Sequence, residues 1–116
     1  MSDTGQCSFV CPIEAAAEVI GGKWKARILF QLQGGTKRFN ELKRQLPGVT
    51  QRMLTKQLRE LEADQIVYRK VFPEIPPKVE YSLTEFGQTL TPSLKALQDW
   101  GLEYLDTLAR IRNQNS

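Results

Sequence analysis

The stretch Thr50-Gln-Arg-Met-Leu-Thr-Lys-Gln-Leu-Arg-Glu-Leu-Glu-Ala-Asp64 has the pattern of an amphipathic helix. Leu54, Leu58 and Leu61 recur at steps of four and three residues, so they form one apolar stripe with helical periodicity. A Pro47-Gly48 turn precedes the stretch, and the Thr50 hydroxyl is well placed to cap the first free N–H groups. We therefore predict a helix over residues 50–64 that buries one face.

The other face of this predicted helix is polar and basic. It carries Gln51, Arg52, Thr55, Lys56 and Arg59, and its acids occur only near the end, at Glu60, Glu62 and Asp64. Cations and free N–H groups at the start of a helix both favour phosphate. By itself, however, a basic helix face is also typical of an ordinary solvated surface.

Positive charge is concentrated around this helix. Residues 37–78 contain ten Lys or Arg and five Asp or Glu, a net charge of +5, whereas the rest of the chain has six and eight, a net charge of −2. Such an asymmetry indicates a surface that binds a polyanion, and a dimer would double it.

Length and composition indicate a single domain. A chain of 116 residues with 41% hydrophobic and 25% charged residues is long enough for its own core, and dimerisation would add to its stability. No run of 18 apolar residues occurs and the N-terminus resembles no signal peptide, so we expect a cytoplasmic protein that does not enter the membrane. The two cysteines should then normally be reduced.

Before this helix, the pattern predicts a flexible arm over residues 1–10 and three helices. The first opens at Cys11-Pro12, with the proline at its first position, and ends at Gly21-Gly22. The second runs from about residue 23 or 24 to 33, and an extended link over 36–39 follows. We expect Asn40 to cap a short helix over 41–46, which with the helix at 50–64 makes a helix-turn-helix.

After this helix, the periodicity changes from helical to alternating. Residues 66–72 are rich in β-branched and aromatic side chains, and residues 78–83 alternate strictly. The prolines of residues 73–77 cannot continue a strand, so we predict a hairpin over 66–83, a wing beside the helix-turn-helix.

A final helical region begins at Thr84, the expected cap, and extends to about residue 111. Pro92 allows either one bent helix or a fresh start capped by Thr91. Its apolar residues cover more than one side, which favours a dimer interface formed with the helix at 12–21. The alternative is packing on its own domain.

Several short motifs occur together in a specific order. They are Cys11-Pro12, Gly21-Gly22-Lys23-Trp24, Ile28-Leu29, Arg38-Phe39-Asn40-Glu41-Leu42, Leu54-Thr55-Lys56-Gln57-Leu58-Arg59-Glu60-Leu61, Pro76-Pro77-Lys78-Val79-Glu80-Tyr81 and Leu83-Thr84-Glu85-Phe86-Gly87. Over roughly residues 11–105 the chain resembles the HxlR-type transcriptional regulators, winged helix-turn-helix proteins related to the MarR group. It departs from the family at Asp64-Gln65, where a glycine often follows the recognition helix.

The resemblance implies an α+β, mainly α fold: a winged helix-turn-helix domain over residues 11–111 with dimerisation helices at 12–21 and 84–111. It also implies a homodimer, most simply a repressor, on an inverted-repeat operator in double-stranded DNA. The recognition helix 50–64 would enter the major groove and the wing 66–83 would flank it.

Within that fold, the chemistry of each side chain predicts whether it contacts a DNA base or a phosphate. Arg and Lys donate to guanine and Gln pairs with adenine, so we expect Arg52, Lys56 and Gln51 at base edges. Phosphate contacts are expected from Thr50, Thr55, Arg59, Lys37, Arg38 and Lys43, and from the wing cations Arg69, Lys70 and Lys78.

Cys11 matches the N-terminal cysteine with which several family members sense oxidants or electrophiles. The start of a helix favours a thiolate, and Cys7 is close enough in sequence to form a disulfide with it, within or between subunits. The alternative is a small buried apolar residue. The aromatic residues Trp24, Tyr68, Phe72, Tyr81 and Trp100 fit the core and the dimer interface, or the lining of a cavity for a small effector.

The sequence argues against an enzyme. It has no histidine, no glycine-rich phosphate loop and only two cysteines, which make a poor metal site, so we expect no cofactor. The remaining alternative is a winged domain that senses a small molecule or binds a protein without a redox switch.

Overall fold

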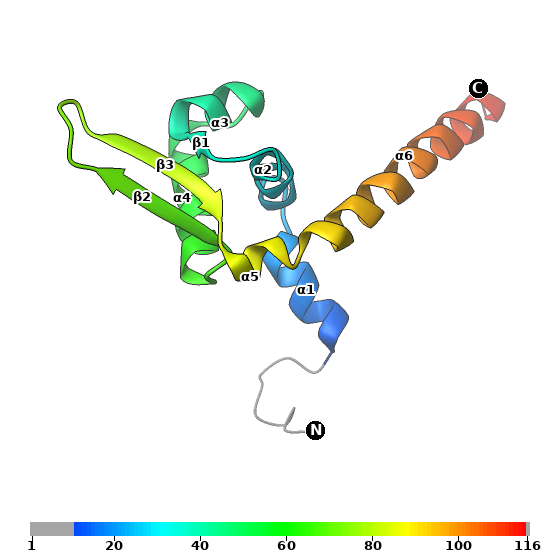
Figure 1. The fold of residues 1–116 in the computed structure, drawn as a ribbon. Helices are drawn as coiled ribbons and strands as arrows, with labels where there is room; N and C mark the ends of the chain where they lie inside the picture. The colour runs from blue at the N-terminus through cyan, green and yellow to red at the C-terminus, as the bar shows by residue number, and fades with distance from the viewer. Residues whose placement is uncertain (1–10, 116) are drawn as a thin grey trace.

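The computed structural model describes residues 11–115, and its elements follow the predicted order (Figure 1). The helices are α1 (Pro12–Ile20), α2 (Lys25–Leu32), α3 (Phe39–Gln45), α4 (Gln51–Ala63), α5 (Glu85–Gln88) and α6 (Thr91–Gln114), and the strands are β1 (Lys37–Arg38), β2 (Val67–Phe72) and β3 (Lys78–Leu83). The fold is mainly helical with a small antiparallel sheet, as predicted.

The predicted hairpin forms, and it gains a third strand. The order in the sheet is β1-β3-β2, with Phe72 opposite Lys78 and Val67 opposite Leu83. The segment expected to be only an extended link supplies β1, which pairs with β3 through Lys37 and Tyr81. This pairing places the start of α3 beside the middle of β3.

The core lies where α2, α3 and α4 meet the sheet. Its fully buried side chains are Ile28, Leu29, Leu42, Leu46, Leu54, Leu58 and Leu61. The apolar stripe predicted for α4 is therefore buried, which leaves its polar face outside.

Two predicted helix caps are wrong. The helix α3 begins at Phe39 rather than Glu41, so Asn40 lies inside it, and the N–H of Arg38 at the cap position donates to Glu41 Oε1 (2.9 Å). Thr91 is not a cap either, because α6 begins at Thr91, after Leu90. At α3, Glu41 lies three residues after the cap position and its side chain accepts the Arg38 N–H, so no asparagine cap is needed. At α6, Pro92 is favourable in the first turn, so the helix can include Thr91.

The final helical region makes a fresh start rather than one bent helix. Thr84 caps α5 as predicted, since its Oγ1 accepts from the N–H of Gly87 (2.8 Å). From there α6 extends away from the sheet to Gln114, beyond the predicted end at 111 (Figure 1). None of the helices in residues 11–115 combines the length and hydrophobicity that crossing a bilayer requires.

Candidate nucleic-acid interface

The helix α4 presents the polar face that the sequence predicted. Thr50 caps it by accepting a hydrogen bond from the N–H of Met53 (3.1 Å). Opposite the buried leucines, a hollow of about 680 Å³ is open to solvent. It is lined by Gln51, Arg52, Thr55, Lys56, Arg59 and Glu60. Five predicted contact residues therefore share one accessible surface.

The end of α4 is well defined despite the missing glycine. Gln65 adopts a left-handed conformation, with a φ of 61°. Its N–H donates to the Glu62 carbonyl (2.9 Å), and the N–H of Ile66 donates to the Leu61 carbonyl (3.0 Å). This is the Schellman arrangement that usually contains glycine, and the burial of Leu61 and Ile66 accompanies it.

The three wing cations lie on two faces of the hairpin. Lys70 and Lys78 lie on the same face as Phe72, since alternate residues of a strand share a face and Phe72 is opposite Lys78. Arg69 is on the other face, opposite Tyr81. Burial raises the pKa of the Tyr81 hydroxyl, and the nearby Arg69 guanidinium offsets part of this rise.

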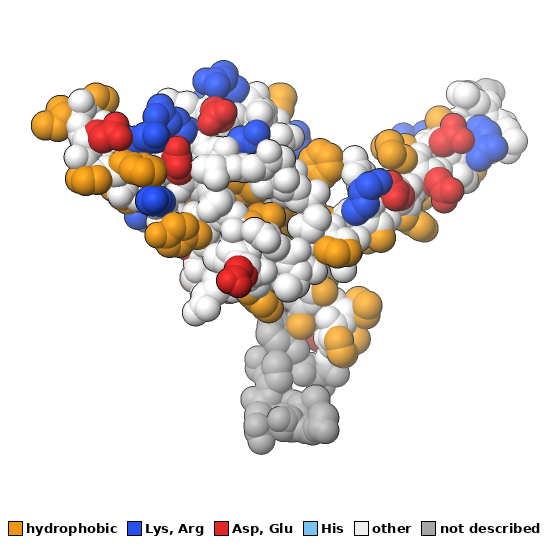
Figure 2. All heavy atoms as spheres, viewed as in Figure 1, with side chains coloured by type: hydrophobic (Ala, Val, Ile, Leu, Met, Phe, Trp, Pro, Cys, Tyr) orange, Lys and Arg blue, Asp and Glu red, His pale blue; other side chains and the backbone are white. Residues whose placement is uncertain are grey.

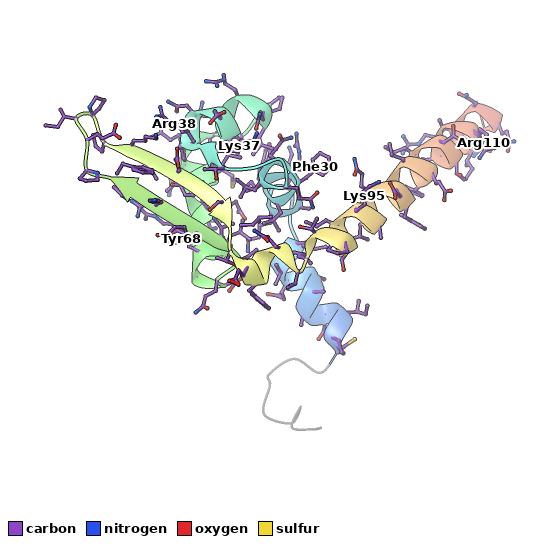
Figure 3. The ribbon with its side chains drawn as sticks, in the orientation of Figure 1. Phe30, Lys37, Arg38, Tyr68, Lys95 and Arg110 are labelled. Atoms are coloured by element: carbon purple, nitrogen blue, oxygen red, sulfur yellow. The ribbon has the colours of Figure 1, made fainter. Side chains whose placement is uncertain are left out.

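The remaining predicted phosphate contacts lie around the start of α3. Lys37 and Arg38 form β1, which leads directly into this helix (Figure 3). Arg38 lines a second hollow, of about 770 Å³, between α3 and the wing, together with Lys78 and Arg44. Lys43 is exposed on α3 and borders another hollow with Arg44. Sequence reasoning did not select Arg44, although Arg44 directly follows Lys43 in the same basic segment.

Figure 2 shows Lys and Arg gathered over the wing and α3, and hydrophobic side chains along α6 and around α1. Large exposed apolar residues on the latter two helices include Ile13, Leu97, Trp100, Leu102, Tyr104, Leu105 and Ile111. No residue of α1 is buried. The apolar surface predicted for these helices is thus uncovered in the single chain.

Cys11 occupies the cap position of α1 and is exposed in the single chain. Its carbonyl accepts from the N–H of Ala15 (3.1 Å). Cys7 lies outside the described residues.

The aromatic residues divide between core and surface. Trp24 and Tyr81 are buried in the core, whereas Tyr68 and Trp100 are more than half exposed. An apolar hollow of about 310 Å³ does exist between α2 and α6, lined by Ala26, Arg27, Phe30, Gln31, Gln45, Leu46, Leu94, Leu97 and Gln98. None of the five aromatic residues considered for an effector cavity lines it.

Comparison with known proteins decides the family. Residues 19–109 match the profile of the HxlR-like helix-turn-helix family. The chain belongs to this family. Two relatives from Bacillus subtilis, the uncharacterized HTH-type transcriptional regulators YdeP and YybR, are 52% and 54% identical. The matches cover 87% and 89% of this chain and 79% and 82% of those proteins.

Solved structures of similar proteins agree with this assignment. The redox regulator HypR in its reduced form is 55% identical, with a TM-score of 0.82 over 84% of this chain and 97% of that one. The reduced form of the transcriptional regulator YodB from B. subtilis is 41% identical, with a TM-score of 0.70 over 79% of this chain and 91% of that one. This HxlR-like chain is therefore an HTH-type transcriptional regulator and not an enzyme.

Proposed function

We propose that this regulator binds an inverted-repeat operator as a homodimer, with α4 of each subunit in a major groove. The observation that carries the proposal is the exposed basic face of α4, opposite three fully buried leucines. Arg52, Lys56 and Gln51 contact base edges, because their donors match guanine and adenine in the major groove.

The surrounding residues contact the DNA backbone and fix the register of α4. They are Thr50, Thr55, Arg59, Lys37, Arg38, Lys43, Arg69, Lys70 and Lys78. Such contacts orient a protein on the duplex and make its affinity depend on salt, but they carry no sequence information of their own.

The exposed apolar residues of α1 and α6 hold the two subunits together. So many large apolar side chains exposed on two helices are unusual for a monomer and typical of an interface. The symmetry of such a dimer matches the symmetry of an inverted repeat. The proposed effect on transcription is repression, since a dimer bound to its operator excludes other proteins from that stretch of DNA.

The test begins with Arg52→Ala and Lys56→Ala, measured on a duplex that the wild-type protein selects from a randomised pool. Each variant should lose about 1–3 kcal/mol of binding free energy at fixed salt. Lys95→Ala is the matched control, because it also removes one exposed cation but lies on α6, paired with Asp99 at 2.9 Å (Figure 3). Unchanged binding by both α4 variants would remove the assigned role of this helix.

We further propose that Cys11 makes the regulator responsive to oxidants. Cys11 is exposed at the start of a helix, and the similar structures include the redox regulator HypR and a diamide-treated YodB. In the proposed step the thiols of Cys11 and Cys7 each give up a hydrogen to diamide and their sulfurs join. The disulfide forms within one subunit or between two, and it shifts the subunits relative to each other.

Cys11→Ser tests the switch. Diamide should change the operator affinity of the wild-type protein and leave that of the variant unchanged, and a thiol reductant should reverse the change. An equal response in the two proteins, or no response in either, would eliminate Cys11 as the sensor.

A further inference from the structure

Two lysines of the wing share one aromatic ring. Lys70 Nζ lies 4.9 Å and Lys78 Nζ 4.7 Å from the centroid of Phe72. Lys70 is two residues before Phe72 on β2, and Lys78 is directly across on β3. The strand register therefore brings both ammonium groups to the same ring.

One carboxylate joins this cluster. Glu80 Oε2 lies 3.4 Å from Lys78 Nζ, and Glu80 is directly across from Lys70. The three charged groups leave a net charge of +1 on this face of the hairpin. Because the ring and the carboxylate both attract the ammonium groups, the two lysines can lie close together despite their repulsion.

The ring of Phe72 is not required for the core. Phe72 is only half-buried, and it does not belong to the cluster of buried residues or to the side chains that pack against that cluster. On the opposite face of the hairpin, Val79 does pack against the core. The contacts that the structure gives for the Phe72 ring are with the two lysines.

We propose that Phe72 is a positioning residue for DNA binding, which holds Lys70 and Lys78 ready for the phosphates beside the major groove. This inference rests on the proposed function. A free lysine side chain loses rotamer freedom when it contacts a phosphate, and that loss weakens binding. A lysine already held against a ring loses less, so the ring strengthens DNA binding without touching the DNA.

The experiment compares Phe72→Leu, Phe72→Tyr and Phe72→Trp, on the duplex selected by the wild-type protein and at fixed salt. Leucine keeps an apolar side chain but removes the π-face, and its affinity should fall about 3- to 10-fold. Tyrosine and tryptophan retain the face and should bind within about twofold of wild type. Phe72→Met repeats the test if leucine disturbs the hairpin.

A double-mutant cycle separates positioning from direct contact. In a Lys70→Ala/Lys78→Ala background, Phe72→Leu should have no further effect, because the ring has no lysine left to hold. Tyr68→Leu is the control variant: it makes a similar change on the same face of β2, where no cation among residues 11–115 is placed over the ring.

Three results would exclude a positioning role for Phe72. The inference is overturned if Phe72→Leu binds as wild type, if Phe72→Tyr is as weak as Phe72→Leu, or if Phe72→Leu costs the same with and without the lysines. A wild-type protein that enriches no sequence and binds DNA without salt dependence overturns the proposed function as well. Selection of a sequence with no effect of Phe72→Leu overturns the role of the ring alone.

Discussion

Lys25 Nζ lies 2.7 Å from Glu60 Oε1, which connects the first residue of α2 to the C-terminal half of α4. The lysine side chain is 12% exposed and the glutamate 43%. The hydrogen bond and the charge of Lys25 lower the pKa of Glu60 below its ordinary value of 4.5. Glu60 also borders the hollow of α4, where we propose that DNA binds. The charge of Lys25 therefore offsets a carboxylate that would otherwise repel the DNA phosphates.

Glu60→Gln should therefore reduce stability in a pH-dependent way. Because the pKa of Glu60 is lower in the folded chain, the ion pair stabilises the protein above the unfolded pKa, and this contribution is lost as the pH falls through the folded pKa. Denaturant unfolding should show the variant less stable than wild type at pH 7, with the difference closing in acid.

Glu103→Gln is the control for this change, since Glu103 is an exposed carboxylate on α6 with no ion pair to the part of the chain that the structure describes. A difference between Glu60→Gln and wild type that is equally large in acid and at pH 7 would contradict the role of the pair.

Gln65→Gly should stabilise the protein. A side chain at a φ of 61° is strained, and glycine removes that strain while keeping the hydrogen bonds of the helix end. We expect a gain of about 0.5–1 kcal/mol in the free energy of unfolding, measured by denaturant titration. Gly48→Ala, at a φ of 92°, is the converse variant and should lose stability. A destabilised Gln65→Gly protein would show that the glutamine side chain contributes more than its conformation costs.

Local patterns in the sequence predicted the recognition helix, the hairpin and two of the helix caps. The periodicity of Leu54, Leu58 and Leu61 predicted α4 and its buried face, and alternation predicted the hairpin. Threonine at the start of a helical pattern correctly predicted Thr50 and Thr84 as caps. These features depend on residues near one another in the chain, so the sequence pattern reports them directly.

What the sequence could not give depends on contacts between distant segments. The pairing of Lys37 with Tyr81 makes a strand of a segment that has no strand pattern. The grouping of Lys70 and Lys78 on Phe72 follows from the strand register, and the Lys25–Glu60 pair from the packing of α2 on α4. Asn40 is a favourable cap residue by type, but Arg38 occupies the cap position of α3 because Glu41 can accept a hydrogen bond from the Arg38 N–H.

Gly87→Ala should unfold or strongly destabilise the chain. An added Cβ would overlap the Ile66 carbonyl oxygen, a backbone atom at the junction of α4 and β2 that cannot easily move. Overpacking of this kind costs about 1–3 kcal/mol or more. Gly101→Ala is the control, because no atom of residues 11–115 other than its chain neighbours and the backbone of α6 lies within 4 Å of an added Cβ at that position, and it should gain about 0.5–1 kcal/mol from helix propensity. Thermal unfolding of both proteins gives the answer, and equal midpoints would contradict the predicted overlap.

The proposed dimer can be tested on α6. The rings of Trp100 and Tyr104 stack with centroids 5.3 Å apart, and both side chains are exposed in the single chain, as is Leu105. If a second subunit covers them, Trp100→Ser should weaken association by about 2 kcal/mol or more, since buried tryptophans dominate interfaces. Leu105→Lys should act in the same direction, by placing a charge in the apolar contact.

Sedimentation at several concentrations measures the association, with Lys95→Ala on the same helix as the control. Operator affinity should fall together with dimerisation, because two linked α4 helices bind an inverted repeat far more tightly than two separate ones. In α6 the buried core includes Leu94 but neither Trp100 nor Leu105, so circular dichroism of the two variants should stay close to that of wild type. Variants that sediment and bind the duplex as the wild-type protein does would show that the exposed face of α6 is not the dimer interface.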